Sequence, residues 1–194
     1  MPLKNRARKQ AADAKAIFQA ALSAAHAGNA VRAHLSLSRG ILKAGPHRFP
    51  LRSFDRIFLI AIGKAAVEMA AAVEDIVGDH LAGGLAITKH GHAQRRRLRI
   101  PIVEAGHPIP DAAGIEAAHQ VQEILRQLNA RDLLLVTVSG GASALLSAPA
   151  DPVTLAAKQK TTDLLLRAGA DIFQLNAVRK HLSFLKVVRL AALA

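Results

Sequence analysis

The chain has 194 residues, 51% of them hydrophobic, which is ample for the core of a folded globular domain. It has no cysteine, so disulfides and thiol chemistry are excluded, and we expect a cytoplasmic location. Charged residues or glycines interrupt every apolar run before it reaches the roughly 18 to 20 residues that cross a bilayer, so we expect no membrane span. The formal net charge of +12 indicates an anionic partner, or an acidic part of the protein outside this chain.

The first residues, 1–45, predict a helical lead-in. Helical periodicity indicates one helix from about Lys9 to Ala27 and a second from about Ala30 to Lys43. The sequence AGPHRFP is rich in helix breakers and closes the second helix.

Strands and helices alternate after this lead-in. We expect strands at Arg56–Gly63, Gly84–Lys89, Leu98–Gly106 and Leu133–Val138, and helices at Lys64–Gly78 and about Asp111–Leu128. The strands are apolar without polar alternation, which is typical of strands buried on both faces. The expected fold class is therefore α/β, with a mostly parallel sheet covered by helices on both sides.

Two more helices are expected in the last third of the chain. Asp151 is a candidate N-cap with Pro152 at the first helical position, and Gly169 ends this helix. Asp171 can cap a last helix that runs from Ile172 to Ala194. A parallel α/β fold would normally continue from there into another strand, so we expect the chain to be part of a longer protein.

Lys64 is the first candidate for chemistry. It follows Gly63 at the end of a predicted buried strand, and ligands of parallel sheets collect at the carboxyl ends of the strands. A lysine there can reach a phosphate or a developing oxyanion. A surface lysine is the alternative, but the helix dipole disfavours a cation at the start of a helix, so we favour a functional role.

The glycine loop, Ser139–Ser143, is the second candidate. Gly140 and Gly141 allow backbone amides to approach an anion closely, and Ser139 and Ser143 add hydroxyls beside Ala142. Ser-Gly-Gly also forms purely structural turns, so the pattern alone leaves a turn and an anion site equally open. Neither a Walker loop nor a G-x-G-x-x-G fingerprint is present, which argues against a Walker-type NTPase and a standard dinucleotide site.

The predicted last helix carries a polar stripe between two apolar flanks. Asn176, Arg179, Ser183 and Lys186 are separated by steps of three, four and three residues, so they follow one line along a helix. A cationic line between apolar flanks is poorly explained by a surface helix, and we interpret it as the side of a hydrated cleft.

The histidines give weaker signals. His90 and His92 lack nearby carboxylate or Cys partners, so we favour a structural role over metal binding. His107 follows a strand end, where a ligand contact and a turn-forming role are equally open. The ligands of a divalent cation stay unknown, with Glu104 and Asp111 as the only candidates that we name.

These segments together resemble the type II glycerate kinases, the glycerate 2-kinase family whose C-terminal part is called the MOFRL domain. The matching segments are AIGKAAVEMA, EAGHPIPD, VTVSGGASALLSAP and, above all, LLLRAGADIFQLNAVRKHLSFLK. The resemblance implies a Rossmann-like three-layer sandwich and ATP-dependent phosphorylation of D-glycerate at its 2-hydroxyl, with Mg²⁺. Some relatives have been labelled hydroxypyruvate reductases, which the absence of a dinucleotide fingerprint does not support.

The resemblance also implies roles for single residues. Lys64 becomes the lysine that stabilises the phosphoryl group, Ser139–Ser143 become an anion loop, and Asn176, Arg179 and Lys186 line the cleft. This assignment suits phosphoryl transfer, which depends on positioning and charge neutralisation more than on covalent help.

Two departures from the family pattern limit what the chain is expected to do. Lys186 is followed by Val187-Val188 where the family has two glycines, and valine cannot adopt the conformations that glycine permits. The resemblance covers only the N-terminal half, so we interpret residues 1–194 as the N-terminal domain without the MOFRL domain. We therefore expect little or no kinase activity from this chain alone.

Other readings stay open at this point. A basic domain that binds nucleic acid or another polyanion without catalysis is the main alternative, and an inactive remnant is another. Aromatic residues are only 3% of the chain and Trp and Tyr are absent, which disfavours base stacking. The cluster of Arg95, Arg96, Arg97 and Arg99 is typical of a solvated loop. The sequence leaves homodimerisation undecided.

Overall fold

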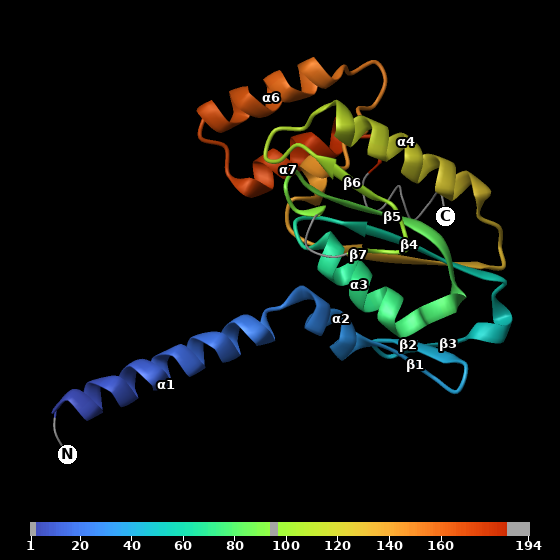
Figure 1. Ribbon diagram of the computed structural model, residues 1–194. Coiled ribbons are helices and arrows are strands. Elements are labelled where there is room, and N and C mark those ends of the chain that lie inside the picture. Colours follow the sequence, from blue (N-terminus) through green and yellow to red (C-terminus); the bar gives the residue numbers. More distant parts are fainter. Residues whose placement is uncertain (1–2, 94–96, 186–194) are drawn as a thin grey trace.

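A parallel sheet of four strands forms the centre of the computed structural model, which describes residues 3–93 and 97–185 (Figure 1). The order across the sheet is β6 (Ile102–Ala105), β5 (Leu81–Lys89), β4 (Arg56–Ile62) and β7 (Asp132–Val138). Each neighbouring pair is parallel. The expected α/β fold with a mostly parallel sheet is confirmed.

Helices cover both faces of this sheet, as the apolar strands predicted. Helix α3 (Ala66–Val77) lies on one face and α4 (Ala112–Gln127) on the other (Figure 1). Leu145 of the short α5 (Ala142–Leu145) packs in the same cluster as α4. On β4, Leu59 packs in the α3 cluster and Ile60 in the α4 cluster, and both are fully buried. Complete burial of such a side chain contributes about 1.5–3 kcal/mol, which accounts for the apolar residues at successive positions of the strand after Arg56.

The second predicted helix is wrong over most of its length. Helix α2 covers only Ala27–His34, and an antiparallel sheet follows, with strands β1 (Leu35–Ser38), β2 (Ile41–Ala44) and β3 (His47–Pro50). Arg39 and Gly40 connect the first two strands with φ of 50° and 73°, the conformation of a tight hairpin turn. Leu42 is fully buried in the α3 cluster, so this small sheet extends the core on that face.

Helix α1 (Leu3–Ala24) extends away from the rest of the molecule (Figure 1). The predicted helix at 9–27 is confirmed, although it begins earlier and ends earlier than expected. Its apolar side chains Ile17, Phe18 and Leu22 are 71%, 63% and 56% exposed. None of the described helices combines the length and the apolar character needed to cross a membrane.

Strand β7 is more exposed than the sequence predicted. It pairs with β4 alone in the described part of the sheet, so it lies at an edge. Val136 and Val138 are 38% and 45% exposed, although the sequence predicted a buried strand. Its apolar composition is that of an interior strand, and its position is that of an edge strand.

The last two helices are α6 (Leu155–Arg167) and α7 (Ile172–His181), joined through Gly169, which has a φ of 75°. The N-cap of α6 is Thr154, whose hydroxyl accepts a hydrogen bond from Ala157 N, so the prediction of Asp151 as N-cap and Pro152 as first helical residue is wrong. Asp151 and Pro152 instead form a turn before the helix.

The predicted cap at Asp171 is confirmed, and it forms a reciprocal capping box with Gln174. The helix is shorter than predicted, because it ends at His181. Ser183 pairs with Pro149 in a β-bridge instead of continuing the polar line along the helix. Two short 3₁₀ turns, η1 (Leu51–Ser53) before β4 and η2 (Gly78–His80) before β5, complete the described elements.

A buried lysine joins α6 to the segments around it. Lys158 is 1% exposed, and its Nζ donates hydrogen bonds to Ser147 Oγ at 3.2 Å and to Ser183 Oγ at 2.8 Å. Ser147 follows α5 and Ser183 follows α7, so the ammonium group ties three segments together. The hydrogen bonds offset part of the cost of burying the charge.

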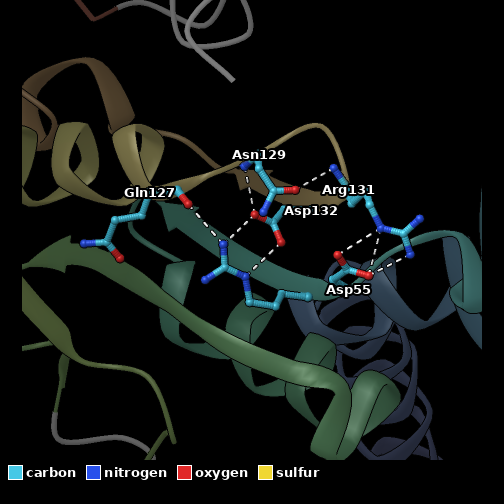
Figure 2. A network of polar contacts seen from close by, with 6 residues as sticks. Asp55, Gln127, Asn129, Arg131 and Asp132 are labelled. Carbon is cyan, nitrogen blue, oxygen red and sulfur yellow. Dashed lines mark hydrogen bonds and ion pairs between the residues drawn. The ribbon is translucent and has the colours of Figure 1, made fainter.

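Ion pairs at the amino ends of β4 and β7 hold the two strands in register (Figure 2). Arg56 donates from Nε and Nη2 to the two carboxylate oxygens of Asp132, at 2.9 and 2.7 Å, and Arg131 pairs with Asp55. The Arg56 hydrogen bond holds the pKa of Asp132 below its ordinary value. This network lies at the end of the strands opposite the loops that follow β4 and β7.

Candidate functional site

The carboxyl ends of β4 and β7 bring Lys64 and the glycine loop together. Ile62 pairs with Val138, and the chain leaves both strands at the same edge of the sheet. Ser139 N donates a hydrogen bond to Ile62 O at 2.8 Å, and Lys64 N donates one to Gly140 O at 2.9 Å. The two segments that the sequence singled out separately are therefore hydrogen-bonded neighbours.

Gly63 makes this approach possible. Its φ is 129°, and a Cβ atom at this position would lie 2.1 Å from Ser139 Oγ and 2.6 Å from Ser139 O. The Ser139 hydroxyl in turn accepts a hydrogen bond from Ala65 N at 3.1 Å. A side chain at residue 63 would separate the two loops, so glycine is required here for packing as well as for backbone conformation.

The side chain of Lys64 extends along the glycine loop. A Cβ at Gly140 would lie 3.7 Å from Lys64 Cε, and a Cβ at Gly141 would lie 3.3 Å from Lys64 Cγ. Gly141 has a φ of 95°, which favours glycine. Lys64 is exposed, so its ammonium group is accessible to a ligand from solvent.

Two further residues contribute to the surroundings of this loop, His107 and Lys89. The sequence left the role of His107 open and did not point to Lys89. The imidazole of His107 approaches Gly141, where an added Cβ would lie 2.8 Å from its Cδ2 and 3.0 Å from its Nε2. Burial lowers the pKa of His107, and the positive charges of Lys64, Lys89 and Arg179 lower it further. Lys89 is the last residue of β5, and its place at a strand end was the signal that could have found it.

Arg179 on α7 has an unusual environment. Its Nε and Nη2 are shielded from solvent, and no group in the described residues accepts a hydrogen bond from either atom. Burial lowers the pKa of this guanidinium. Nε and Nη2 form one edge of the guanidinium plane, which can donate two parallel hydrogen bonds to a carboxylate or a phosphate. We call Lys64, Lys89, His107, Arg179 and the loop Ser139–Ser143 the cationic site.

The other residues of the predicted polar line do not all join this site. Asn176 is exposed on α7, and Ser183 is engaged with Lys158 away from the helix. Lys186 and the Val187-Val188 pair lie outside the described residues, so their expected role stays a prediction. Of the arginine cluster, Arg99 pairs with Asp79 at 2.9 Å.

The carboxylates named as metal candidates already have hydrogen-bond partners. Glu104 accepts a hydrogen bond from Ala93 N at 2.6 Å, which holds its pKa below the ordinary value. Asp111 lies 2.7 Å from His90 Nε2 and accepts a hydrogen bond from Gly114 N, which caps α4. Among residues 3–93 and 97–185, no three His, Cys, Asp or Glu side chains gather as metal ligands. Both candidates are thus engaged in hydrogen bonds within the fold, and we assign neither of them to a Mg²⁺ site.

The sequence matches the family model described as "Domain of unknown function (DUF4147)" over residues 13–194. It is 41% identical to the D-glycerate 2-kinase of Thermotoga maritima over 149 residues. The aligned region covers 77% of this chain and 36% of that protein. The chain therefore spans about a third of the length of this relative.

Solved structures agree with the fold. A crystal structure of a protein from Pyrococcus horikoshii OT3 superposes with a TM-score of 0.83 at 37% identity, over 93% of this chain and 40% of that one. The crystal structure of a glycerate kinase from Thermotoga maritima gives a TM-score of 0.65 at 42% identity, over 71% of this chain and 33% of that one.

Proposed function

Because the chain belongs to the DUF4147 family of glycerate 2-kinases, we propose that it is the N-terminal, Rossmann-like domain of an enzyme that phosphorylates D-glycerate at the 2-hydroxyl with ATP. The observation that carries the proposal is the buried, unpartnered edge of the Arg179 guanidinium. Burying unsatisfied donors is costly, and Arg179 and Lys64 both act electrostatically on His107 at the glycine loop, so these donors support an anionic ligand at this site.

The cationic site suits the charge changes of phosphoryl transfer. ATP supplies the phosphoryl group, and charge on its oxygens must be neutralised as it moves to the hydroxyl. Lys64 can follow the moving charge because its exposed side chain is flexible. Arg179 is held in place by burial and can fix the orientation of a carboxylate or a phosphate. The glycine loop lets backbone approach the ligand closely.

We propose that residues 1–194, with the helical lead-in of 1–45, supply one side of the active site. A C-terminal MOFRL domain would supply the other side, and the short span of this chain relative to its family supports this arrangement. The chain alone should then release little or no ADP from ATP in the presence of D-glycerate. Robust D-glycerate-dependent ADP release by the purified chain would contradict the division of the site between two domains.

Ligand protection tests the proposal without requiring turnover. D-glycerate or ATP should raise the unfolding temperature of the wild-type chain saturably, because a ligand that binds only the folded state stabilises it. Lys64→Ala should lose this protection, and Lys43→Ala, which removes an exposed lysine from β2, should keep it. Binding to DNA or RNA that falls steeply with salt and is unaffected by Lys64→Ala would instead support a basic polyanion-binding domain.

A further inference from the structure

The cationic site is rich in hydrogen-bond donors and poor in acceptors. Lys64, Lys89 and Arg179 can only donate hydrogen bonds. The hydroxyl of Ser139 already accepts one from Ala65 N. These groups suit a carboxylate or a phosphoryl group, but the substrate of the proposed reaction also has a hydroxyl, which must donate its proton to an acceptor.

His107 offers a hydrogen-bond acceptor beside the glycine loop. Its Nε2 and Cδ2 form the ring edge that approaches Gly141, at 3.0 and 2.8 Å from the position of an added Cβ. The Lys64 side chain passes the same point, with Cγ at 3.3 Å. Nε2 therefore lies at the glycine loop, and the side chain of Lys64 reaches the same residue of the loop.

The surroundings of His107 keep the ring uncharged. Burial is the main cause of its lowered pKa, and Lys64 in the loop before α3, Lys89 at the end of β5 and Arg179 on α7 add to it. The carboxylates on either side of it along the chain already have partners: Glu104 accepts a hydrogen bond from Ala93 N, and Asp111 is engaged with His90 and with Gly114 N. A neutral imidazole has one nitrogen that accepts a hydrogen bond, whereas imidazolium has none.

We propose that His107 binds the reacting hydroxyl of the hydroxy-acid substrate by accepting its hydrogen bond at Nε2. The proposal rests on the proposed function and adds a catalytic residue to it. In the transfer step, the hydroxyl oxygen forms a bond to the γ-phosphorus and the bond from that phosphorus to the bridging oxygen breaks. The electron pair of the broken bond leaves with ADP, and the hydroxyl proton passes to His107.

Binding of two simple acids to the 194-residue chain tests this contact. Propanoate has the carboxylate alone, and D-lactate adds only the 2-hydroxyl. One hydrogen bond to a neutral acceptor should make D-lactate bind about three- to tenfold more tightly than propanoate. Both affinities can be measured from chemical shifts of backbone amides in the glycine loop during NMR titrations.

Variants at position 107 separate hydrogen bonding from packing. His107→Leu should keep propanoate binding and lose the advantage of D-lactate, because leucine fills the space without an acceptor. His107→Gln should restore part of the advantage, since an amide oxygen can accept the hydrogen bond. His47→Leu, which changes an exposed histidine on β3, should leave the ratio of the two affinities unchanged.

The pH dependence gives an independent signature. The ratio should be constant at neutral and higher pH and should fall towards one as the pH drops through the pKa of His107, which burial holds below its ordinary value of 6.5. His107→Gln should show no such fall, because glutamine does not titrate. This change in the ratio is not expected from a residue that only packs against the loop.

The outcomes distinguish the two proposals. Equal affinities of D-lactate and propanoate for the wild-type chain, or an undiminished advantage in His107→Leu, would overturn the role of His107 and leave the anion site in place. Absence of amide shifts in the glycine loop with propanoate and with sulfate would overturn the anion site itself, and the inference with it.

Discussion

Gly63→Ala is the substitution that tests the geometry of the site most severely. The new Cβ would lie 2.6 Å from the carbonyl oxygen of Ser139, where an ordinary carbon–oxygen contact is roughly 3.3 Å. The two loops must therefore separate, which weakens the hydrogen bonds from Ser139 N to Ile62 O and from Lys64 N to Gly140 O. Two such bonds contribute about 2 kcal/mol together, and a φ of 129° in alanine costs about 1–3 kcal/mol more.

We therefore expect Gly63→Ala to lower the free energy of unfolding by about 3–5 kcal/mol. Gly40→Ala is the matched control, because Gly40 also has a positive φ of 73° but has no atom within 4 Å of its added Cβ. Its cost should be conformational alone, about 1–2 kcal/mol. Urea denaturation followed by far-ultraviolet circular dichroism measures both values. Equal losses in the two variants would refute the close approach of the loops.

Two further variants test features outside the site. Lys158→Met removes the ammonium group that joins three segments and should lower the free energy of unfolding by about 2–4 kcal/mol. Lys160→Met, on the exposed side of α6, should change this free energy little. Urea denaturation measures both variants, and similar losses would contradict the account of Lys158. Arg56 lowers the pKa of Asp132, so the ion pair stabilises the fold above the ordinary carboxylate value of 3.8 and loses this contribution as the pH falls through the lower folded-state pKa. Asp132→Asn should therefore show a weaker loss of stability in acid than the wild type, as measured by urea midpoints between pH 2 and 5, and an unchanged acid dependence would refute this.

The sequence predicted the central sheet well because burial on both faces leaves a strong local pattern. The run Ile57–Ile62 is apolar without interruption, and Asp171 has the residue type and spacing of a helix cap. Lys64 and the glycine loop could also be found, because ligands of parallel sheets collect after the strands. Their mutual hydrogen bonds could not, since these depend on β7 lying next to β4.

The errors have local and long-range causes. Over Leu35–Pro50, Leu35 and Leu37 alternate with serines, which favours a strand, and Gly40 favours a turn, but apolar residues at helical spacing in the same segment favour a helix. The burial of Lys158 has no local signal, because its partners Ser147 and Ser183 come from distant segments. The same holds for the acceptor edge of His107, which becomes visible only when Gly141 lies against it.

The central claim is that the cationic site binds the anionic substrates of a glycerate kinase. The most direct measurement is a heteronuclear NMR titration of the 194-residue chain with D-glycerate and then with ATP. The account predicts saturable shifts that concentrate at the amides of residues 63–65 and 139–143 and at Arg179 Nε, with smaller changes in Lys64→Ala. Shifts confined to the basic helix α1, or none at the glycine loop with either ligand, would contradict it.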